Sequence, residues 1–167
     1  MKTLHLLLTL FLIMLFASCS KEQSASKGVS ILVNIMVENT QGQNLLDPFT
    51  PGHFKIEDIK KYDLVDGKEK LFYMANWNDP WGFRLVGEGE MTHLSLAPNI
   101  ERTESNPTTT YIDWGNGDKD TLVCKMRTDS EGYYYFTEEV WFNGERVFPD
   151  QSQKYPGFAG RGFKIVK

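Results

Sequence analysis

The sequence predicts an all-β fold: a single β-sandwich domain of about eight or nine short antiparallel strands. Aromatic residues make up 13% of the chain, and aromatic side chains are enriched in strands. Glycine and proline, at 14 and 7 residues, interrupt the chain at short intervals, with alternating apolar and polar residues between them. Short alternating runs at a spacing of about ten residues, with almost no helical periodicity, are typical of β-sandwiches.

The first expected element is a strand over residues 29–38. Its apolar residues at every second position would share one buried face: Val29, Ile31, Val33, Ile35 and Val37. Leu32 and Met36 make the opposite face apolar as well, which predicts a central strand. Residues 39–52 are rich in Asn, Gln, Gly and Pro, and we expect a loop there.

Residues 54–61 fit neither the helical nor the strand period, so both alternatives stay open. Residues 62–73 are clearer, because Asp66-Gly67 separates two strand-like runs. These two residues tolerate the positive φ angles of a type I′ turn, so we expect a tight hairpin. Two further strands are expected at 83–86 and 93–96.

The second half of the chain predicts two more hairpins and a closing strand. A polar run at 99–108, between two prolines, is expected to be a surface loop. Asn143-Gly144 is the strongest of the turn signals that follow. The expected strands are 109–114 and 121–127 around a turn at 115–118, then 133–142 and 145–148 around Asn143-Gly144, and finally 162–166.

The number and spacing of these strands favour a sandwich of the immunoglobulin-like or transthyretin-like type. Residues 111–117, Tyr-Ile-Asp-Trp-Gly-Asn-Gly, also resemble the Trp-x-x-Gly-x-Gly signature of polycystic-kidney-disease-type extracellular repeats, with the order of Asp and Gly altered. Those repeats are β-sandwiches. The resemblance implies the same fold class and carries over no site residue.

Residues 1–18 have the pattern of a secretory signal peptide. A single cation, Lys2, precedes an apolar stretch that ends at Phe16. A helix that spans a membrane needs about 20 apolar residues, and this stretch is shorter. We therefore expect residues 1–18 to direct export and not to form part of the fold.

The four residues Phe16-Ala17-Ser18-Cys19 resemble the lipobox of bacterial lipoproteins. The resemblance implies cleavage before Cys19, attachment of a diacylglycerol to its thiol and acylation of the new amine. Several acyl chains anchor a protein stably to a bilayer. The alternative is an ordinary signal peptide cut at Ala17 or Ser18, which would leave Cys19 as a free thiol.

The residues after the lipobox predict a tether and then the fold. Residues 19–28 are rich in Ser and charge and lack apolar periodicity, so we expect a flexible tether, with the sandwich domain at 29–167. Ser20-Lys21-Glu22 looks like the short signals that direct lipoproteins to the cell surface in the Bacteroidota. The whole chain is similar in type to small outer-membrane lipoproteins of that phylum. This resemblance implies an outer-membrane, surface-exposed location.

Charge and composition exclude some classes of function. The chain has 18 basic and 22 acidic residues, a formal net charge of −4, without clusters of Lys or Arg. This pattern argues against nucleic-acid binding. The glycine-rich run at 157–162 lacks a following helix that could present backbone amides to a phosphate. We expect no cofactor.

The inventory of catalytic residues is thin. His53 and His93 are the histidines that follow the signal peptide, and neither a Gly-x-Ser-x-Gly elbow nor a His-Glu-x-x-His motif is present. Cys124 lies in an expected strand, where a buried thiol is the ordinary interpretation. Carboxylates that could form a glycosidase pair are available at Glu88, Glu90, Asp118 and Glu138. We expect a protein that is not an enzyme, with a small hydrolase as the least favoured alternative.

The strongest binding candidate lies at residues 76–83. Trp77 and Trp81 occur there among amide and acid side chains, namely Asn76, Asn78 and Asp79. Indole rings stack on sugar rings, and amides and carboxylates hydrogen-bond to sugar hydroxyls. The alternative is that the two indoles plug the open end of the sandwich.

Asn116, Asp118 and Asp120 alternate as the first ligands of a calcium loop do. An EF-hand loop also needs Gly at its sixth position and an acid at its twelfth, and Thr121 and Arg127 stand there. Turn chemistry is therefore the preferred interpretation and a cation site the alternative.

These observations together predict a lipid-anchored, non-enzymatic envelope protein that binds a glycan or a protein partner through loop aromatics. The alternative from another class is a structural or assembly subunit of an envelope complex. The membrane partner would be reached through the lipid on Cys19.

Overall fold

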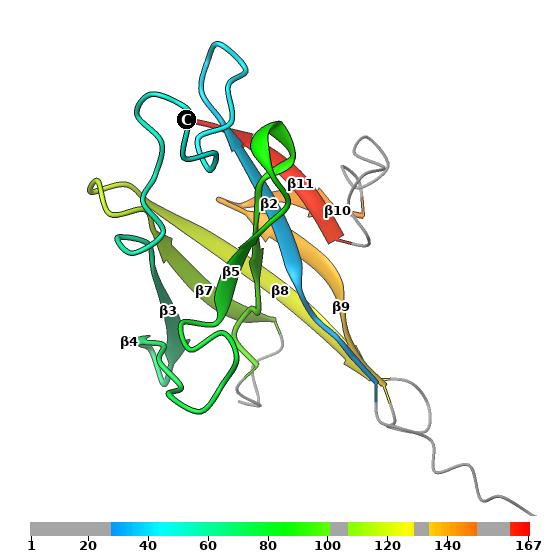
Figure 1. Ribbon diagram of the computed structural model, residues 1–167. Helices are drawn as coiled ribbons and strands as arrows, with labels where there is room; N and C mark the ends of the chain where they lie inside the picture. Colours follow the sequence, from blue (N-terminus) through cyan, green and yellow to red (C-terminus); the bar gives the residue numbers. More distant parts are fainter. Residues whose placement is uncertain (1–27, 101–106, 129–133, 150–160) are drawn as a thin grey trace, which may run out of the picture.

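A computed structural model of the chain describes residues 28–100, 107–128, 134–149 and 161–167. The predicted signal peptide, Cys19 and most of the predicted tether lie outside these residues. The described residues form two β-sheets packed face to face, an all-β sandwich, as the sequence predicts. Figure 1 shows strands β2, β5 and β11 of one sheet in front of β7, β8 and β9 of the other. No helix among the described residues has the length and apolar character needed to cross a membrane.

The larger sheet has the strand order β1-β9-β8-β7-β3-β4, and β10 also pairs with β9. We call it the large sheet. Its strands are β1 (Gly28–Ser30), β3 (Lys60–Val65), β4 (Lys68–Leu71), β7 (Thr108–Asp113), β8 (Lys119–Thr128), β9 (Tyr134–Phe142) and β10 (Glu145–Phe148).

The smaller sheet has the order β11-β2-β6-β5, and we call it the small sheet. Its strands are β2 (Val33–Glu38), β5 (Phe83–Val86), β6 (His93–Leu96) and β11 (Arg161–Val166), with a 3₁₀ turn, η1 (Gly89–Met91), between β5 and β6. Alternate residues of both sheets point inward and form one core, which includes Val33, Ile35, Leu94, Leu122 and Phe163.

The strand predicted at 29–38 is two strands in different sheets. The chain leaves the large sheet after β1, passes Ile31 and Leu32, and enters the small sheet as β2. The prediction of a central strand is confirmed for β2, which lies between β11 and β6. Both β1 and β2 form one parallel pairing, with β9 and β11 respectively, where the sequence predicts antiparallel strands throughout. The other pairings between named strands are antiparallel.

The predicted hairpin turns are confirmed. Asp66 and Gly67 have φ angles of 52° and 71°, and Asn143 and Gly144 have φ angles of 50° and 84°. Two consecutive positive φ angles define the type I′ geometry, which matches the twist of the flanking strands. The third hairpin turns between β7 and β8, as expected.

Two segments differ from expectation. Residues 56–58 form a turn, and the strand begins only at Lys60. Asn99, expected in a surface loop, is 2% exposed. Its backbone N–H donates to the Thr110 hydroxyl at 2.7 Å, and its side-chain amide donates to the Leu64 carbonyl at 3.0 Å. The amide bridges β3 and β7 just beyond their last paired residues, so the polar residue is buried with its hydrogen bonds satisfied.

The large sheet is wider than the small one, and its inner face becomes polar toward β3. Lys61 and Asp63 point inward there, although a period-two pattern would place apolar residues at these positions. Their ammonium and carboxylate groups pair at 2.8 Å. The segment between β4 and β5, residues 72–82, covers them, and we call it the aromatic loop. It lies at the lower end of the sandwich in Figure 1, opposite the end that carries the loop of residues 39–52.

Candidate functional site

The aromatic loop is held by backbone hydrogen bonds within itself. Met74 N–H donates to the Pro80 carbonyl at 2.8 Å, and Trp77 N–H donates to the Met74 carbonyl at 3.0 Å. Gly82 N–H closes the last turn on the Asp79 carbonyl at 2.9 Å. The loop therefore has a defined shape although most of its side chains are exposed.

Phe72 and Gly82 fix the loop to the large sheet. The Phe72 ring lies over the Lys61 ammonium at 3.7 Å from its centroid. Gly82 has a φ angle of +74°, and a Cβ there would lie 2.9 Å from a carbon of the Phe72 ring. Only glycine fits this conformation without strain and allows the ring to approach the backbone so closely.

The two tryptophans of the loop lie at the surface. Trp77 and Trp81 are each 41% exposed, and neither belongs to the buried core. The Trp77 ring contacts Phe72 edge-on with centroids 5.6 Å apart, and Trp81 packs against Tyr73 at 4.6 Å. Both indoles are thus partly covered and partly open at this end of the sandwich. Each ring is oriented by an aromatic neighbour and keeps part of its surface open.

Trp77 lines an open groove of about 380 Å³, which we call the Trp77 groove. Of the five residues predicted for binding, Trp77, Asn78 and Asp79 line it, whereas Asn76 and Trp81 do not. The other lining residues come from the small sheet and its neighbours, among them Leu32, Arg84, Ser95 and Ile100. The Arg84 guanidinium pairs with the Asp79 carboxylate at 2.5 Å, and both groups are partly exposed.

Sequence reasoning missed Leu32, Arg84 and Ser95 as members of this site. They stand far from the aromatic loop in sequence or on a neighbouring strand, and only the pairing of β5 with β6 places Arg84 opposite Ser95. A period-two pattern would have indicated that Arg84 faces solvent between Phe83 and Leu85. Its position two residues after the loop was a local signal for Arg84, whereas Leu32 and Ser95 had no such signal.

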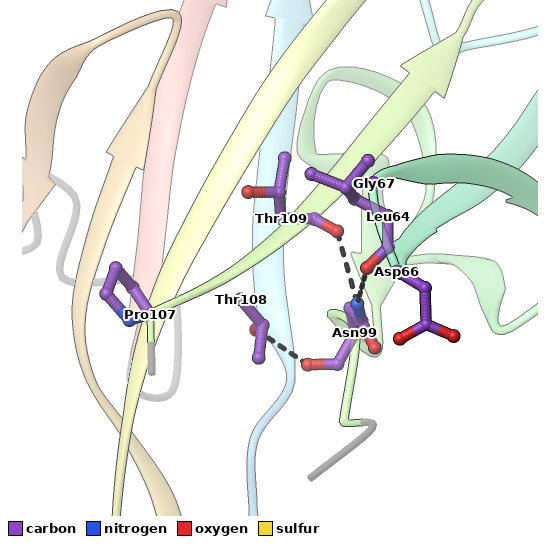
Figure 2. A pocket seen from close by; sticks show the side chains of 7 residues that line it. All are labelled: Leu64, Asp66, Gly67, Asn99, Pro107, Thr108 and Thr109. Carbon is purple, nitrogen blue, oxygen red and sulfur yellow. Dashed lines mark hydrogen bonds between the residues drawn. The ribbon is translucent and has the colours of Figure 1, made fainter. Parts of the chain in front are cut away.

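Two smaller hollows lie at the same end of the sandwich. One, of about 210 Å³, is lined by Lys70, Phe72, Tyr73 and Asn99 and shares Ile100 with the groove; we call it the Tyr73 hollow. The other, of about 250 Å³, lies beside the turn at Asp66-Gly67 and shares Asn99 with the Tyr73 hollow; we call it the Asn99 pocket. Figure 2 shows Asn99 in the Asn99 pocket, hydrogen-bonded to Leu64 and Thr109 and accepting from Thr108.

The Trp77 groove combines an apolar platform with a few polar groups. The indole face offers stacking area, and Asn78, Asp79 and Arg84 offer donors and acceptors around it. The paired charges of Asp79 and Arg84 leave the groove close to neutral. Such a surface suits a ligand with flat apolar faces and many hydroxyls, and it has no concentrated charge for an ionic ligand.

The residues considered for a cation site have other partners. The Lys167 ammonium lies 2.7 Å from Asp118 and 2.5 Å from Asp120. Asp120 also accepts from the Trp114 indole N–H at 2.7 Å, and the Asn116 side chain accepts from the Asp118 backbone N–H at 3.0 Å. Among the described residues, no three His, Cys, Asp or Glu side chains come together as a metal site would require. Turn chemistry accounts for this segment.

Cys124 is fully buried in β8 and belongs to the core. Burial raises the pKa of its thiol to about 12, and the nearby Arg161 opposes this only in part. The thiolate is the reactive form of cysteine, and a raised pKa keeps its population small at neutral pH. Cys124 therefore behaves as a small apolar side chain.

Two of the four carboxylates considered for glycoside chemistry are held by cations. Hydrogen bonding to Lys125, helped by Arg127, holds the pKa of Glu138 below its ordinary value. A general acid of a glycosidase needs the opposite shift. Asp118 pairs with Lys167.

Comparison with known proteins gives no relatives from which a role could be transferred. No protein-family model matches the chain, and neither the curated proteins nor the solved structures contain a match.

Proposed function

We propose that this chain is a non-enzymatic, lipid-anchored envelope protein of the outer membrane that binds a glycan in the Trp77 groove. The observation that carries the proposal is the exposed indole of Trp77, held edge-on against Phe72 beside Asn78 and the Asp79–Arg84 pair. The exposed part of the indole contributes nothing to the stability of the fold. A binding site gains stacking area from it.

The rigidity of the loop supports a binding role. Its backbone is closed by its own hydrogen bonds, and its base is fixed over Lys61. A platform that is already in place loses little conformational entropy when a ligand arrives. The partly exposed polar groups at the rim, Asn78 and Arg84, can exchange water for sugar hydroxyls.

The position of the groove is compatible with the proposed anchor. Leu32, which lines the groove, lies only 13 residues after Cys19 in sequence, and the first strand begins at Gly28. A lipid on Cys19 would thus keep the Trp77 groove within a short tether of the membrane. Such a location favours capture of glycans at the cell envelope over diffusion in free solution.

Glycan-array binding tests the proposal. The soluble form spanning residues 28–167 contains every described strand and would be compared with Trp77→Ala, Trp77→Phe and Phe49→Ala. We expect wild type to bind at least one glycan class, Trp77→Ala to lose the signal and Trp77→Phe to retain part of it. Phe49, 91% exposed and outside the Trp77 groove, is the matched control and should change nothing.

The array has two outcomes that count against the proposal. Absence of binding by the wild type to every glycan removes the glycan function. Equal binding by the wild type and Trp77→Ala places the glycan elsewhere on the protein. In either case a protein partner becomes the leading interpretation of the exposed aromatics.

A further inference from the structure

The hollows at the aromatic end of the sandwich follow one another along a short piece of backbone. The Trp77 groove and the Tyr73 hollow share Ile100, and the Tyr73 hollow and the Asn99 pocket share Asn99. Asn99 and Ile100 are adjacent in sequence and follow β6. The Tyr73 hollow therefore neighbours each of the other two hollows, with Ile100 on one side and the buried Asn99 on the other.

The chemistry of the lining changes along the series. The Trp77 groove offers an indole, and the Tyr73 hollow offers a phenol that is 53% exposed. The Asn99 pocket has no aromatic residue, but it presents the Asp66 carboxylate and the Thr109 side chain beside glycine (Figure 2). Two aromatic platforms followed by a polar pocket match a ligand that repeats an apolar face and hydroxyl groups along its length.

The charges that line the three hollows indicate which class of oligosaccharide they would bind. Asp79 and Arg84 pair in the Trp77 groove. Asp63, which pairs with Lys61, and Lys70 line the Tyr73 hollow, and Asp66 lines the Asn99 pocket. The series has no excess of positive charge, so it provides no electrostatic attraction for sulfated or uronic-acid polymers.

The volumes of the hollows also favour a ligand made of several linked units. Pockets for compact small ligands usually measure about 300–1,000 Å³ and enclose most of the ligand. The Tyr73 hollow and the Asn99 pocket, at about 210 and 250 Å³, are below this range when taken singly. A segmented ligand that places one unit in each hollow would use all three.

We propose that the site takes a neutral oligosaccharide longer than a disaccharide, which runs from the Trp77 groove past Ile100 into the Tyr73 hollow and the Asn99 pocket. This inference rests on the proposed glycan function and specifies its ligand class. Trp77 supplies the main platform, Tyr73 the second, and Thr109 and Asp66 the polar end.

Calorimetric titration of the full chain in detergent, with neutral oligosaccharides of increasing length, tests this inference. The probes are cello-, manno- and malto-oligosaccharides of two, four and six units. In at least one series, we expect the affinity to rise at least about tenfold from the disaccharide to the hexasaccharide. Tyr73→Ala and Thr109→Val should each remove part of that rise. Phe49→Ala is the control that should match the wild type throughout.

Three results would overturn the inference, and they differ in their consequence for the proposed glycan function. Equal affinity at all lengths, lost in Trp77→Ala, reduces the site to the Trp77 groove and leaves the glycan function intact. A length-dependent gain that is unchanged in both Tyr73→Ala and Thr109→Val places the added contacts elsewhere. Absence of binding to the cello-, manno- and malto-oligosaccharides overturns the inference that the site takes a neutral oligosaccharide. The glycan array then tests the glycan function separately. Circular dichroism of each variant confirms that the β fold is retained.

Discussion

The side-chain ammonium of Lys61 lies 3.7 Å from the centre of the Phe72 ring, and this contact joins the large sheet to the aromatic loop. Lys61 is 1% exposed, and its other partner is the Asp63 carboxylate at 2.8 Å. Burial lowers the pKa of the Lys61 ammonium, and the charge of Asp63 opposes that shift. A buried cation thus supports the loop that presents Trp77, so the stability of the site depends on this ion pair.

The Lys61–Asp63 pair gives the first prediction. Lys61→Met removes the cationic partner of a buried carboxylate and should lower the free energy of unfolding by about 3–5 kcal/mol. The double variant Lys61→Met/Asp63→Leu should recover most of this loss, because no buried charge then remains at the site. Urea unfolding of the three proteins measures the effect. A single variant as stable as wild type would show that the pair is not the support described above.

Gly82 gives a second prediction, with a matched control at Gly117. Both glycines have positive φ angles, +74° and +87°, but only at Gly82 would a Cβ meet other atoms within 4 Å. Gly117→Ala should cost about 1–2 kcal/mol from backbone strain alone. Gly82→Ala should cost about 1–3 kcal/mol more, because the methyl group collides with Phe72. Equal losses in urea unfolding would contradict the close packing of Phe72 on Gly82.

Cys124 predicts a pH dependence of stability. The pKa of its thiol is about 12 in the folded chain against an ordinary value of 9.0, so the folded protein keeps a proton that the unfolded chain releases above pH 9. The contribution of the thiol is fully present below pH 9 and falls by about 1.4 kcal/mol per pH unit between pH 9 and 12.

The comparison of wild type with Cys124→Ala isolates this term, because other titrating groups cancel in the difference. The stability advantage of the wild type over the variant should be constant below pH 9 and decline above it. A difference that stays constant up to pH 11 would show that the thiol is accessible to solvent. Resistance of the thiol to iodoacetamide in the native state, with rapid modification in urea, is the complementary observation.

The proposed anchor predicts a defined amino terminus. When the chain is produced with residues 1–18 in a Gram-negative host, intact mass spectrometry should find it beginning at Cys19 and carrying acyl chains. Detergent phase partition should place it in the detergent phase and Cys19→Ala in the aqueous phase. A bare amino terminus, or a wild type that partitions like Cys19→Ala, would remove the anchor from the account.

Local signals account for most of what the sequence predicted. Asp66-Gly67 and Asn143-Gly144 marked their hairpins because the positive φ angles of a type I′ turn restrict the residues that can occupy it. The pairing of β1 with β9 and of β2 with β11 was missed because it joins segments more than 100 residues apart. No local period carries information about such partners.

The distinction between local sequence signals and long-range contacts applies to the site as well. Trp77, Asn78 and Asp79 could be named because the aromatic and polar residues are contiguous. Arg84 follows the loop directly and pairs with Asp79 five residues earlier, whereas Leu32 and Ser95 reach the groove only through tertiary packing. Lys61 reads in the sequence as a surface lysine, and its burial depends on Asp63 and Phe72 together. Asn99 was expected at the surface because it begins a polar run. The hydrogen-bond partners that allow its burial come from two other strands, which the local sequence does not reveal.

The central claim is that Trp77 contacts the glycan, and the indole N–H resonances test it most directly. The chain has four tryptophans, of which Trp114 is buried and far from solvent. On titration with a glycan that binds the array, the account predicts that the Trp77 resonance shifts progressively to saturation while that of Trp114 stays in place. A saturating titration that leaves the Trp77 resonance unmoved would contradict it.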